Sequence, residues 1–413
     1  MLNAMTCSYL GAMVKTAGIR VVLPSGFVLR GPDTGTITLT FYRWRDVFRV
    51  VCSPSVGLAE LYAEQRISID GGDILDLVIR LMDPAVEKSA PRAMHLTTGL
   101  MKFLQPLSEG WSARISRRNV SHHYDLGNDL YGLFLDQDWQ YSCAYFDEDG
   151  ISIDEAQRRK KDHIARKLRL GPEDSVLDIG SGWGGMALHL SGMAKSVKGI
   201  TLSEQQLEES RNRAKATNAD VSFELKDYRH EKGKFDRVVS VGMLEHVGKQ
   251  HYGNFFHCVS RCLNQDGLGL IHTIGRPNPP NGTDRFIRKY IFPGGYLPSL
   301  SQLTTAIEQT DLVISDIEVL FLHYAETLRH WRKRFLHNRQ QAVELKDEYF
   351  ARIWEFYLAA SEAAFRNGNL VVFQIQVKKP GAKPPATRDL SLIHISEPTR
   401  QAEIAYAVFC LKK

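Results

Sequence analysis

The chain has 413 residues, 43% of them hydrophobic and 24% charged, which is enough to bury a large core without disulfide bonds. Its 52 Lys and Arg against 47 Asp and Glu give a formal charge of only +5, which calls for no nucleic-acid partner. Six scattered cysteines without C-x-x-C spacing favour neither a metal site nor a disulfide framework and suit a reducing cytoplasm. We expect no membrane-spanning helix, because no apolar stretch reaches roughly 18 residues.

The N-terminal part has the pattern of a small α+β domain. Residues 19–52 are predicted to form short strands and turns, because β-branched and aromatic residues cluster there around Gly and Pro. Residues 57–82 carry apolar side chains at helical intervals, broken by a Gly-Gly pair. The proline-containing stretch 83–120 is interpreted as the connection to a second domain, and the first domain is placed at 1–105.

From residue 174 onward, short apolar runs alternate with longer amphipathic segments. This alternation is typical of a parallel sheet that is covered by helices on both faces. The predicted strands are 175–180, 196–201, 221–225, 235–242, 267–275, 312–320 and 371–377. We therefore predict an α/β domain over 106–380, followed by a linker and tail, 381–413, to which we assign no function.

The strongest local signal is the segment Val176–Gly185, where a buried strand runs into a glycine-rich turn and then a helix. Glycines there let the backbone approach a ligand at the carboxyl end of the strand. A turn that binds nothing is the alternative. Asp178 and the G-S-G-W-G spacing that follows are similar to motif I of S-adenosylmethionine-dependent methyltransferases and differ from the G-x-G-x-x-G of dinucleotide enzymes. The predicted cofactor is therefore S-adenosylmethionine.

Two further segments are candidates for contacts with this cofactor. Thr201 follows the second strand, where most such methyltransferases have an acidic residue, so we expect Gln205 or Gln206 to replace that carboxylate. Ser203 also has the position of a helix N-cap, with Gln206 completing a capping box, and both interpretations can hold. Asp227–Arg229 follows the third strand, where adenine-binding residues usually lie; a polar turn is the alternative.

Five motifs, in order along the chain, resemble those of the cyclopropane-fatty-acyl-phospholipid synthases and their mycolic-acid relatives. They are Ser121–Asn128, Tyr141–Phe146, Val241–Gly248, His272–Gly275 and Tyr290–Gly295. The resemblance runs from about 116 to 378 and implies a Rossmann-like class I methyltransferase fold, doubly wound with a mostly parallel seven-stranded sheet. It also implies the reaction: methyl transfer from S-adenosylmethionine to the cis double bond of an unsaturated phospholipid acyl chain, then ring closure after a base removes a proton.

In this family the base is understood to be bound bicarbonate. The resemblance implies that Glu245, His272 and Tyr324 hold bicarbonate by side chains, and that Cys143 and Ile274 hold it by backbone groups. Without the resemblance, an isolated strand histidine such as His272 is more often a core residue, and Tyr324 is as readily a core residue as a site residue. Nothing in the sequence indicates a reactive Cys143 thiol. The implied cofactor-binding residues are Tyr141, Ser142, Asp178, Gly180, Ser181, Gly182, Trp183, Gly184, Thr201, Leu202, Ser203, Gln205, Gln206, Asp227, Tyr228 and Arg229.

Ser361 departs from the pattern, because many relatives have a cysteine there that is sometimes labelled catalytic. Ring closure by bicarbonate needs no thiol at this position. We therefore predict that Ser361 is a packing position on a helix.

Basic residues cluster in two stretches, 158–169 and 329–334, the second beside Trp331. Solvated helix faces are the ordinary explanation. For an enzyme acting on phospholipid, such clusters also favour docking on an anionic membrane. We therefore expect a cytoplasmic protein associated peripherally with the inner face of the membrane, with a homodimer left open.

Other functions are weighed against this one. A related methyltransferase would give a methylated lipid or small-molecule product without ring closure, and a lipid-surface binding protein would carry a vestigial site; intact Asp178, Gly180 and Gly182 argue against the latter. Nucleic-acid methylation is rejected, because Asn278–Asn281 lacks the aromatic residue that stacks on a flipped base. Residues 391–413 look like a translated sequencing-adaptor artefact, and we expect their deletion to leave activity intact.

Overall fold

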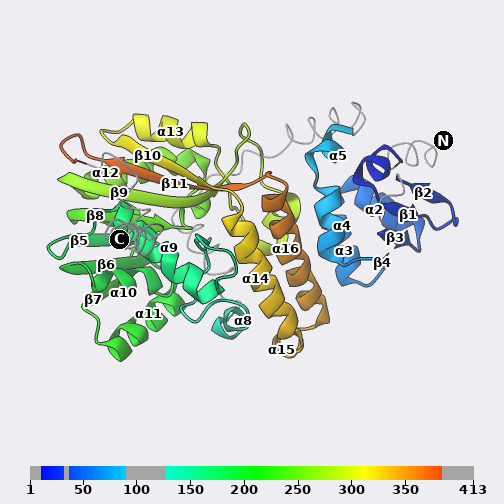
Figure 1. Cartoon of the computed structure of the whole chain (residues 1–413), viewed down its shortest axis with the longest axis horizontal. Coiled ribbons are helices and arrows are strands. Elements are labelled where there is room, and N and C mark those ends of the chain that lie inside the picture. Colours follow the sequence, from blue (N-terminus) through cyan, green and yellow to red (C-terminus); the bar gives the residue numbers. More distant parts are fainter. Residues whose placement is uncertain (1–10, 32–36, 90–126, 384–413) are drawn as a thin grey trace, which may run out of the picture.

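The computed structural model describes residues 11–31, 37–89 and 127–383. It contains a four-stranded sheet near the N-terminus and a seven-stranded sheet formed by the rest of the described chain (Figure 1). The predicted domain boundary near residue 105, most of the motif Ser121–Asn128 and nearly all of the predicted tail lie outside the described residues.

The N-terminal unit is a small α+β structure with strand order β2-β1-β3-β4. Its elements are β1 (Arg20–Val22), β2 (Val28–Arg30), β3 (Thr38–Phe41), α2 (Trp44–Cys52), α3 (Pro54–Ala63), β4 (Ile67–Asp70), α4 (Ile74–Leu81) and α5 (Pro84–Ser89). Two of them differ from the prediction. α2 lies in a stretch expected to form strands, because its β-branched and aromatic residues fall at helical spacing and bury Val47 completely. β4 lies in a stretch expected to be helical, and it pairs antiparallel with β3.

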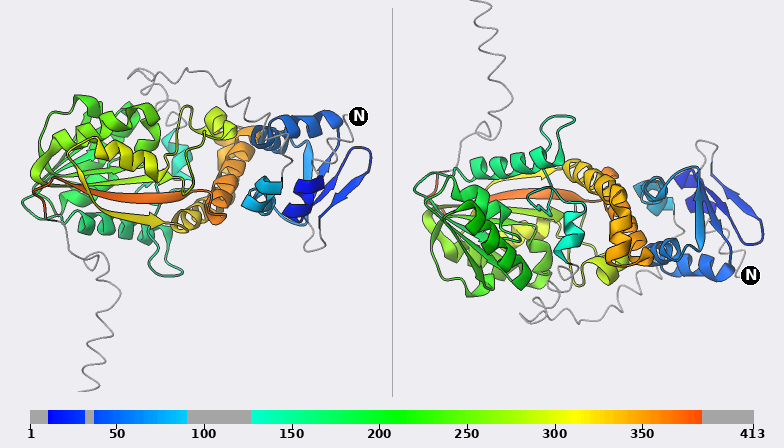
Figure 2. Two further views of the ribbon diagram at one scale, coloured as in Figure 1. Left: turned by 90° about the horizontal axis from the view of Figure 1, so that it is seen from above. Right: turned by 90° about the horizontal axis from the view of Figure 1, so that it is seen from below.

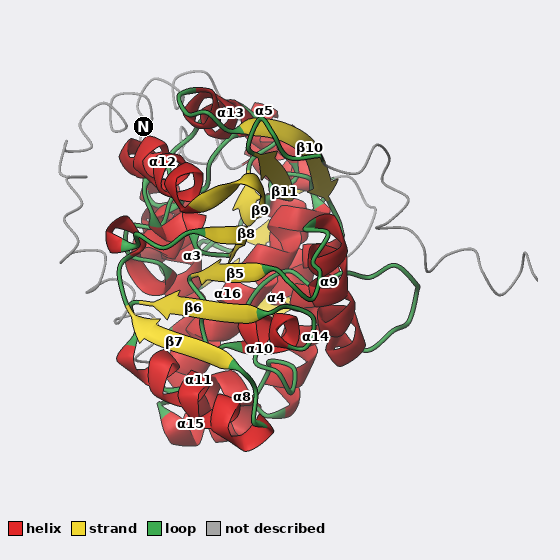
Figure 3. Ribbon diagram, turned by 90° about the vertical axis from the view of Figure 1, so that its left-hand side faces the viewer, coloured by secondary structure: helices red, strands yellow, loops and turns green. Residues whose placement is uncertain are grey.

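The seven-stranded sheet confirms the predicted fold class. Its strands are β5 (Ser175–Ile179), β6 (Ser196–Thr201), β7 (Val221–Leu225), β8 (Phe235–Val241), β9 (Leu263–Gly275), β10 (Val313–Leu320) and β11 (Val371–Lys378). The order is β10-β11-β9-β8-β5-β6-β7, and β11 runs antiparallel to both of its neighbours (Figure 3). Each of the seven predicted segments overlaps one of these strands, although β9 begins before its segment and β11 ends after its segment.

Helices cover both faces of this sheet. α9 (Ile153–Lys167), α10 (Gly185–Ser191) and α11 (Glu204–Thr217) supply the core of one face, and α12 (Tyr252–Cys262) with α13 (Leu300–Glu308) that of the other. Strand residues alternate between these two cores, as the pleat requires. Burial on both faces explains why the strands read as continuous apolar runs in the sequence.

Three helices near the C-terminal end lie between the two sheets: α14 (His323–His337), α15 (Arg339–Leu345) and α16 (Glu348–Arg366) (Figures 1 and 2). α16 packs against α3 and α4 of the N-terminal unit. After α16, the Asn367 side chain donates to the Ile79 carbonyl at 2.7 Å and the Asn369 side chain to the Met82 carbonyl at 3.0 Å. The N-terminal unit is therefore fastened to the helix bundle that carries Tyr324.

Candidate active site

A cavity lies at the carboxyl ends of β5, β6, β7 and β8. The connection after β5 leads to β6 on one side, and the connection after the neighbouring strand β8 leads to β9 on the other side. Open α/β sheets bind ligands at this type of switch point. The cavity is lined by Trp139, Gln140, Tyr141, Ser142, Asp178, Ile179, Gly180, Ser181, Gly182, Trp183, Gly185, Met186, Ile200, Thr201, Leu202, Gln206, Lys226, Asp227, Tyr228, Arg229, Val241, Gly242, Met243, His246, Val247 and His251.

The glycine-rich turn after β5 forms one wall of this cavity. Gly180 and Gly182 have φ angles of +82° and +57°, in the left-handed region that other residues rarely adopt. A Cβ on Gly180 would lie 2.6 Å from the Met243 side chain. The Gly180 and Ser181 amides both donate to the Ile200 carbonyl, at 2.9 and 3.0 Å, so the turn is fixed to β6.

Buried polar atoms on this wall lack partners among the described residues. They include the Asp178 Oδ2 and Ser181 Oγ atoms. Burial raises the pKa of Asp178 to about 7. Buried polar groups are normally hydrogen-bonded, so orphaned ones beside a cavity fit a polar ligand. Both their chemistry and the close backbone approach suit S-adenosylmethionine.

The turn after β6 is organised by its own side chains. The Thr201 hydroxyl donates to the Gln206 side-chain oxygen at 3.1 Å, and the Ser203 hydroxyl caps α11 by accepting from the Gln206 amide at 3.3 Å. Thr201 and Gln206 line the cavity, whereas the Gln205 side chain is exposed away from it. Ser203 therefore acts as the predicted N-cap.

The segment after β7 also reaches the cavity. Asp227 caps a short 3-10 turn, Tyr228–His230, and its carboxylate accepts from the Arg229 amide and guanidinium at 3.0 and 2.9 Å. The Tyr228 ring packs edge-on against Phe255. All predicted cofactor-binding residues except Gly184, Ser203 and Gln205 line the cavity.

Several cavity residues were not selected from the sequence. Met243 and His246 lie within the motif Val241–Gly248, and burial lowers the pKa of His246 to about 4, which keeps its imidazole neutral. Trp139 and Gln140 directly precede the motif Tyr141–Phe146. Their position beside these motifs was the signal that could have found them.

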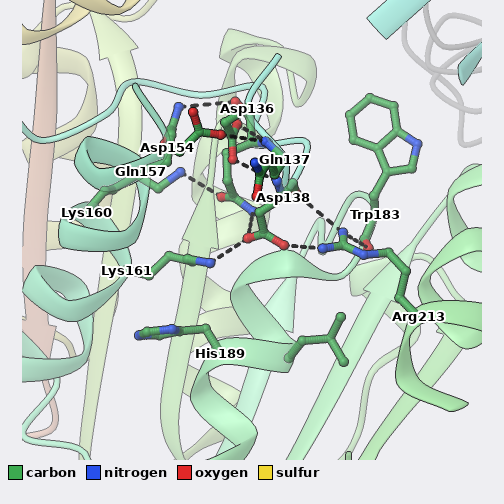
Figure 4. A network of polar contacts seen from close by, with 12 residues as sticks. Asp136, Gln137, Asp138, Asp154, Gln157, Lys160, Lys161, Trp183, His189 and Arg213 are labelled. Atoms are coloured by element: carbon green, nitrogen blue, oxygen red, sulfur yellow. Dashed lines mark hydrogen bonds and ion pairs between the residues drawn. The ribbon is translucent and has the colours of Figure 1, made fainter. Parts of the chain in front are cut away.

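The loop that carries Trp139 and Gln140 is anchored from two helices (Figure 4). The Asp138 carboxylate forms ion pairs with Lys161 of α9 and with Arg213 of α11. The Arg213 guanidinium also donates to the Trp183 carbonyl at 2.9 Å. The Trp183 indole in turn donates to the Asn128 side chain at 3.0 Å, so the end of the first family motif meets motif I.

A second set of candidate residues gathers beside the end of β9. The buried Glu245 carboxylate accepts from the Ile274 amide at 2.6 Å through Oε1, while Oε2 has no partner among the described residues. Burial raises the pKa of Glu245 to about 7. The Ile274 N–H, which was expected to contact bicarbonate, is thus hydrogen-bonded to Glu245 and holds that carboxylate in place.

His272 lies on the same face of β9 as Ile274 and is 2% exposed. The Gln374 side-chain amide lies 3.2 Å from His272 Nδ1, while its oxygen accepts from Lys167 at the same distance. An amide N–H can only donate, so Nδ1 accepts and the proton of the neutral ring sits on Nε2. Burial, together with the nearby Lys160 and Lys167 charges, holds the pKa of His272 well below its ordinary value. Its Nε2 has no partner among the described residues.

Tyr324 and Cys143 belong to one hydrophobic core cluster. The Tyr324 ring packs edge-on against Trp331, and the Tyr141 ring stacks on that same indole. The Ala144 amide donates at 3.0 Å to Thr327, one turn beyond Tyr324. Burial raises the pKa of the Cys143 thiol, which gives it no thiolate character.

The two sets adjoin each other. Cys143 directly follows the cavity residues Tyr141 and Ser142, and Glu245 directly precedes the cavity residue His246. The Tyr141 hydroxyl also lies 2.8 Å from the Tyr357 hydroxyl of α16. A polar cavity therefore opens beside a cluster of aromatic rings and two buried titratable groups.

Many cations of the basic stretches expected to face a membrane are buried or paired with carboxylates of this chain. Lys160 is fully buried. The following cations each form an ion pair with a carboxylate of this chain: Arg158, Arg159, Lys161, Lys167, Arg329, Arg332 and Arg334. These stretches therefore offer a membrane less unpaired charge than the sequence suggests, and docking through them stays a prediction. Within the described ranges, no helix combines the length and apolarity needed to cross a membrane.

Comparison with known proteins also indicates a methyltransferase. The family described as mycolic acid cyclopropane synthetase matches residues 112–375. The cyclopropane-fatty-acyl-phospholipid synthase of Escherichia coli K12 is 36% identical over 88% of this chain and 91% of its own. A probable fatty acid methyltransferase of Pseudomonas putida is 41% identical over 65% of this chain and 71% of its own.

A solved structure gives the same result. The mycolic acid cyclopropane synthase CmaA1, complexed with SAH and CTAB, matches with a TM-score of 0.60 and 32% identity, covering 64% of this chain and 98% of that one. SAH is the product that S-adenosylmethionine leaves after methyl transfer. The chain belongs to the mycolic acid cyclopropane synthetase family of S-adenosylmethionine-dependent methyltransferases.

Proposed function

We propose that this methyltransferase acts on the cis double bond of an unsaturated phospholipid acyl chain and closes a cyclopropane ring with bicarbonate as the base. The observation that carries this proposal is the pair Glu245 and His272. Each is buried beside the cofactor cavity and presents an atom without a partner among the described residues.

The surroundings suit an alkene substrate. An alkene is a weak nucleophile, so the acceleration depends on holding it in line with the methyl donor in a site that excludes water. Bound S-adenosylmethionine supplies an electrophilic methyl group. The rings of Tyr141, Tyr324 and Trp331 form an apolar wall next to the cavity, and aromatic faces stabilise the positive charge that develops on the acyl chain.

The orphaned atoms fit bicarbonate. The Glu245 Oε2 atom can accept from its hydroxyl group, and His272 Nε2–H can donate to its oxygens. Glu245 and His272 would hold the ion by these atoms, and bicarbonate would supply a base for a proton of the transferred methyl group. Gln374 and Lys167 fix the His272 tautomer, and Ile274 fixes the Glu245 carboxylate.

Phospholipid and a membrane surface belong to the same proposal. The Escherichia coli relative, named for a phospholipid product, aligns with 88% of this chain. A cavity lined by Ser53, Val56, Arg285, Arg288 and Lys289 lies where α3 meets the π-helix Ile287–Ile291. Arg285 and Arg288 are exposed and form no ion pair within the described residues. We propose that these cations face the inner leaflet and that residues 1–105 associate with lipid.

A second candidate function is methylation without ring closure. The Pseudomonas putida relative and a tuberculostearic acid methyltransferase of Mycobacterium tuberculosis, 36% identical over 75% of this chain, are named for methyl transfer only. The two functions share the cofactor cavity and differ in the fate of one proton.

Product analysis separates them. Purified protein is incubated with unsaturated phospholipid vesicles and methyl-labelled S-adenosylmethionine, with and without bicarbonate, and the released acyl chains are weighed and tested for unsaturation. We expect the gain of one CH₂ with loss of the alkene, dependent on bicarbonate. A methylated chain that keeps its double bond would support the second function instead.

A further inference from the structure

Lys160 of α9 is a cation enclosed in the protein behind the cofactor cavity. It is 0% exposed, and its ammonium donates to Gln140 Oε1 and to Ser142 Oγ, both at 2.7 Å. Both partners are uncharged and both line the cavity. Lys160 itself does not line it.

Burying an ammonium group without an ion pair is costly. No carboxylate of the described residues lies within ion-pair distance of Lys160, although Asp136 and Asp138 favour its charge from further away. Burial lowers the pKa of Lys160 to about 8, so most molecules keep the charge at pH 7. An apolar side chain would fill this position at lower cost, which indicates that the charge serves the cavity.

The hydrogen-bond directions show how the charge is used. An ammonium group only donates, so the Ser142 oxygen accepts from Lys160 and its own proton points elsewhere. That proton has no acceptor among the described residues. The Gln140 side-chain nitrogen, by contrast, already donates to the Asp138 carboxylate at 3.1 Å. The free direction of the Ser142 hydroxyl is therefore toward the cavity that Ser142 lines.

We propose that Lys160 is a positioning residue that turns the Ser142 hydroxyl toward the carboxylate of the cofactor's amino-acid part. The inference rests on S-adenosylmethionine as the cofactor. That molecule carries one anionic group, its carboxylate, and a hydroxyl that accepts from a cation is a stronger donor to an anion. Two other cavity cations, Arg229 and Lys226, are already paired with Asp227 and Glu231.

Gln157 offers a matched control. One turn before Lys160 on α9, its side-chain amide donates to the Gln140 and Ser142 carbonyls at 3.2 and 2.9 Å. Gln157 therefore holds the segment 140–142 through that segment's backbone carbonyls, and it does so without a charge. Gln157→Leu loosens the segment, whereas Lys160→Met removes the charge and keeps the packing volume.

Binding is measured by calorimetry with two ligands. S-adenosylhomocysteine has the amino-acid part, and 5′-methylthioadenosine lacks it. We expect Lys160→Met and Ser142→Ala each to weaken binding of S-adenosylhomocysteine by at least about tenfold, the lower end for a hydrogen bond to a charged group. Binding of 5′-methylthioadenosine should change less than about twofold. The double variant should bind no more weakly than either single variant. Gln157→Leu should not discriminate between the ligands.

Equal weakening of both ligands by Lys160→Met would make Lys160 merely structural and overturn the proposal, as would unchanged binding. Where Lys160→Met does not fold, Ser142→Ala decides alone, because a variant that fails to discriminate between the ligands contradicts the assigned direction of its hydroxyl. Failure of the wild type to bind S-adenosylhomocysteine would instead count against the cofactor. None of these readouts depends on which lipid product forms.

Discussion

At the scale of single residues, Glu245 makes the stability of the fold depend on pH. Its folded-state pKa of about 7 lies above the unfolded value of about 4.3, because burial disfavours the charged form. The stabilisation is complete below the unfolded pKa and is lost as the pH rises through about 7. A shift of this size corresponds to about 4 kcal/mol over the whole titration.

We therefore predict that wild-type stability falls more between pH 4.5 and pH 7.5 than that of Glu245→Gln, by up to about 3 kcal/mol. Urea unfolding of both proteins in bicarbonate-free buffer measures the difference. Asp178 titrates in the same range and is present in both proteins, so it cancels. Parallel pH profiles would show that Glu245 is not held in its neutral form.

Ser361 provides a second test at this scale. It lies half-buried on α16, and its role as a packing position stays a prediction. Ser361→Cys should change turnover on lipid vesicles by less than about twofold, because the two side chains are nearly isosteric and the proposed base is not a thiol. A gain above tenfold would assign a catalytic role to the thiol that relatives carry.

At the scale of elements, the two glycines of the turn between β5 and α10 should differ in how well they tolerate substitution. Gly180 and Gly182 both have positive φ, but a Cβ on Gly180 would also collide with Met243, whereas a Cβ on Gly182 would meet nothing within 4 Å. Gly182→Ala should cost only the left-handed conformation, about 1–2 kcal/mol. Gly180→Ala should cost more and weaken cofactor binding.

Thermal unfolding and S-adenosylhomocysteine titration of both variants separate the two contributions. Equal losses in the two variants would mean that Met243 moves aside without cost. A larger loss for Gly182→Ala would contradict the packing described for this turn.

The sequence predicts those elements whose structure depends on local pattern, and it does not predict those whose structure depends on packing. The strands of the large sheet were predictable because both of their faces are buried, which produces apolar runs that need no further context. The helix α2 and strand β4 were not, because short segments with mixed patterns are decided by packing against β3 and α3. Lys160 was read as part of a solvated basic stretch, because local sequence does not show that its side chain points into the protein.

At the scale of the whole molecule, the arrangement places the helix bundle α14–α16 between the N-terminal unit and the catalytic sheet (Figure 2). The bundle carries Tyr324 on one side and packs against α3 and α4 on the other. The π-helix is tied to α3 as well, because Lys289 and Tyr290 both bind the buried Glu60 carboxylate. The segment with the proposed lipid-facing cations is thus connected through α3 and the bundle to the site of chemistry.

The proposed docking of these cations can be tested by charge reversal. Arg285→Glu combined with Arg288→Glu should weaken sedimentation with anionic vesicles at least tenfold, because each cation near such a surface contributes about 1 kcal/mol. Lys215→Glu with Lys232→Glu is the matched control, since it changes the net charge equally at exposed positions that form no ion pair within the described ranges. S-adenosylhomocysteine binding should be unchanged in both double variants. An equal loss of vesicle binding in the two double variants would mean that net charge, and not a defined face, governs membrane association.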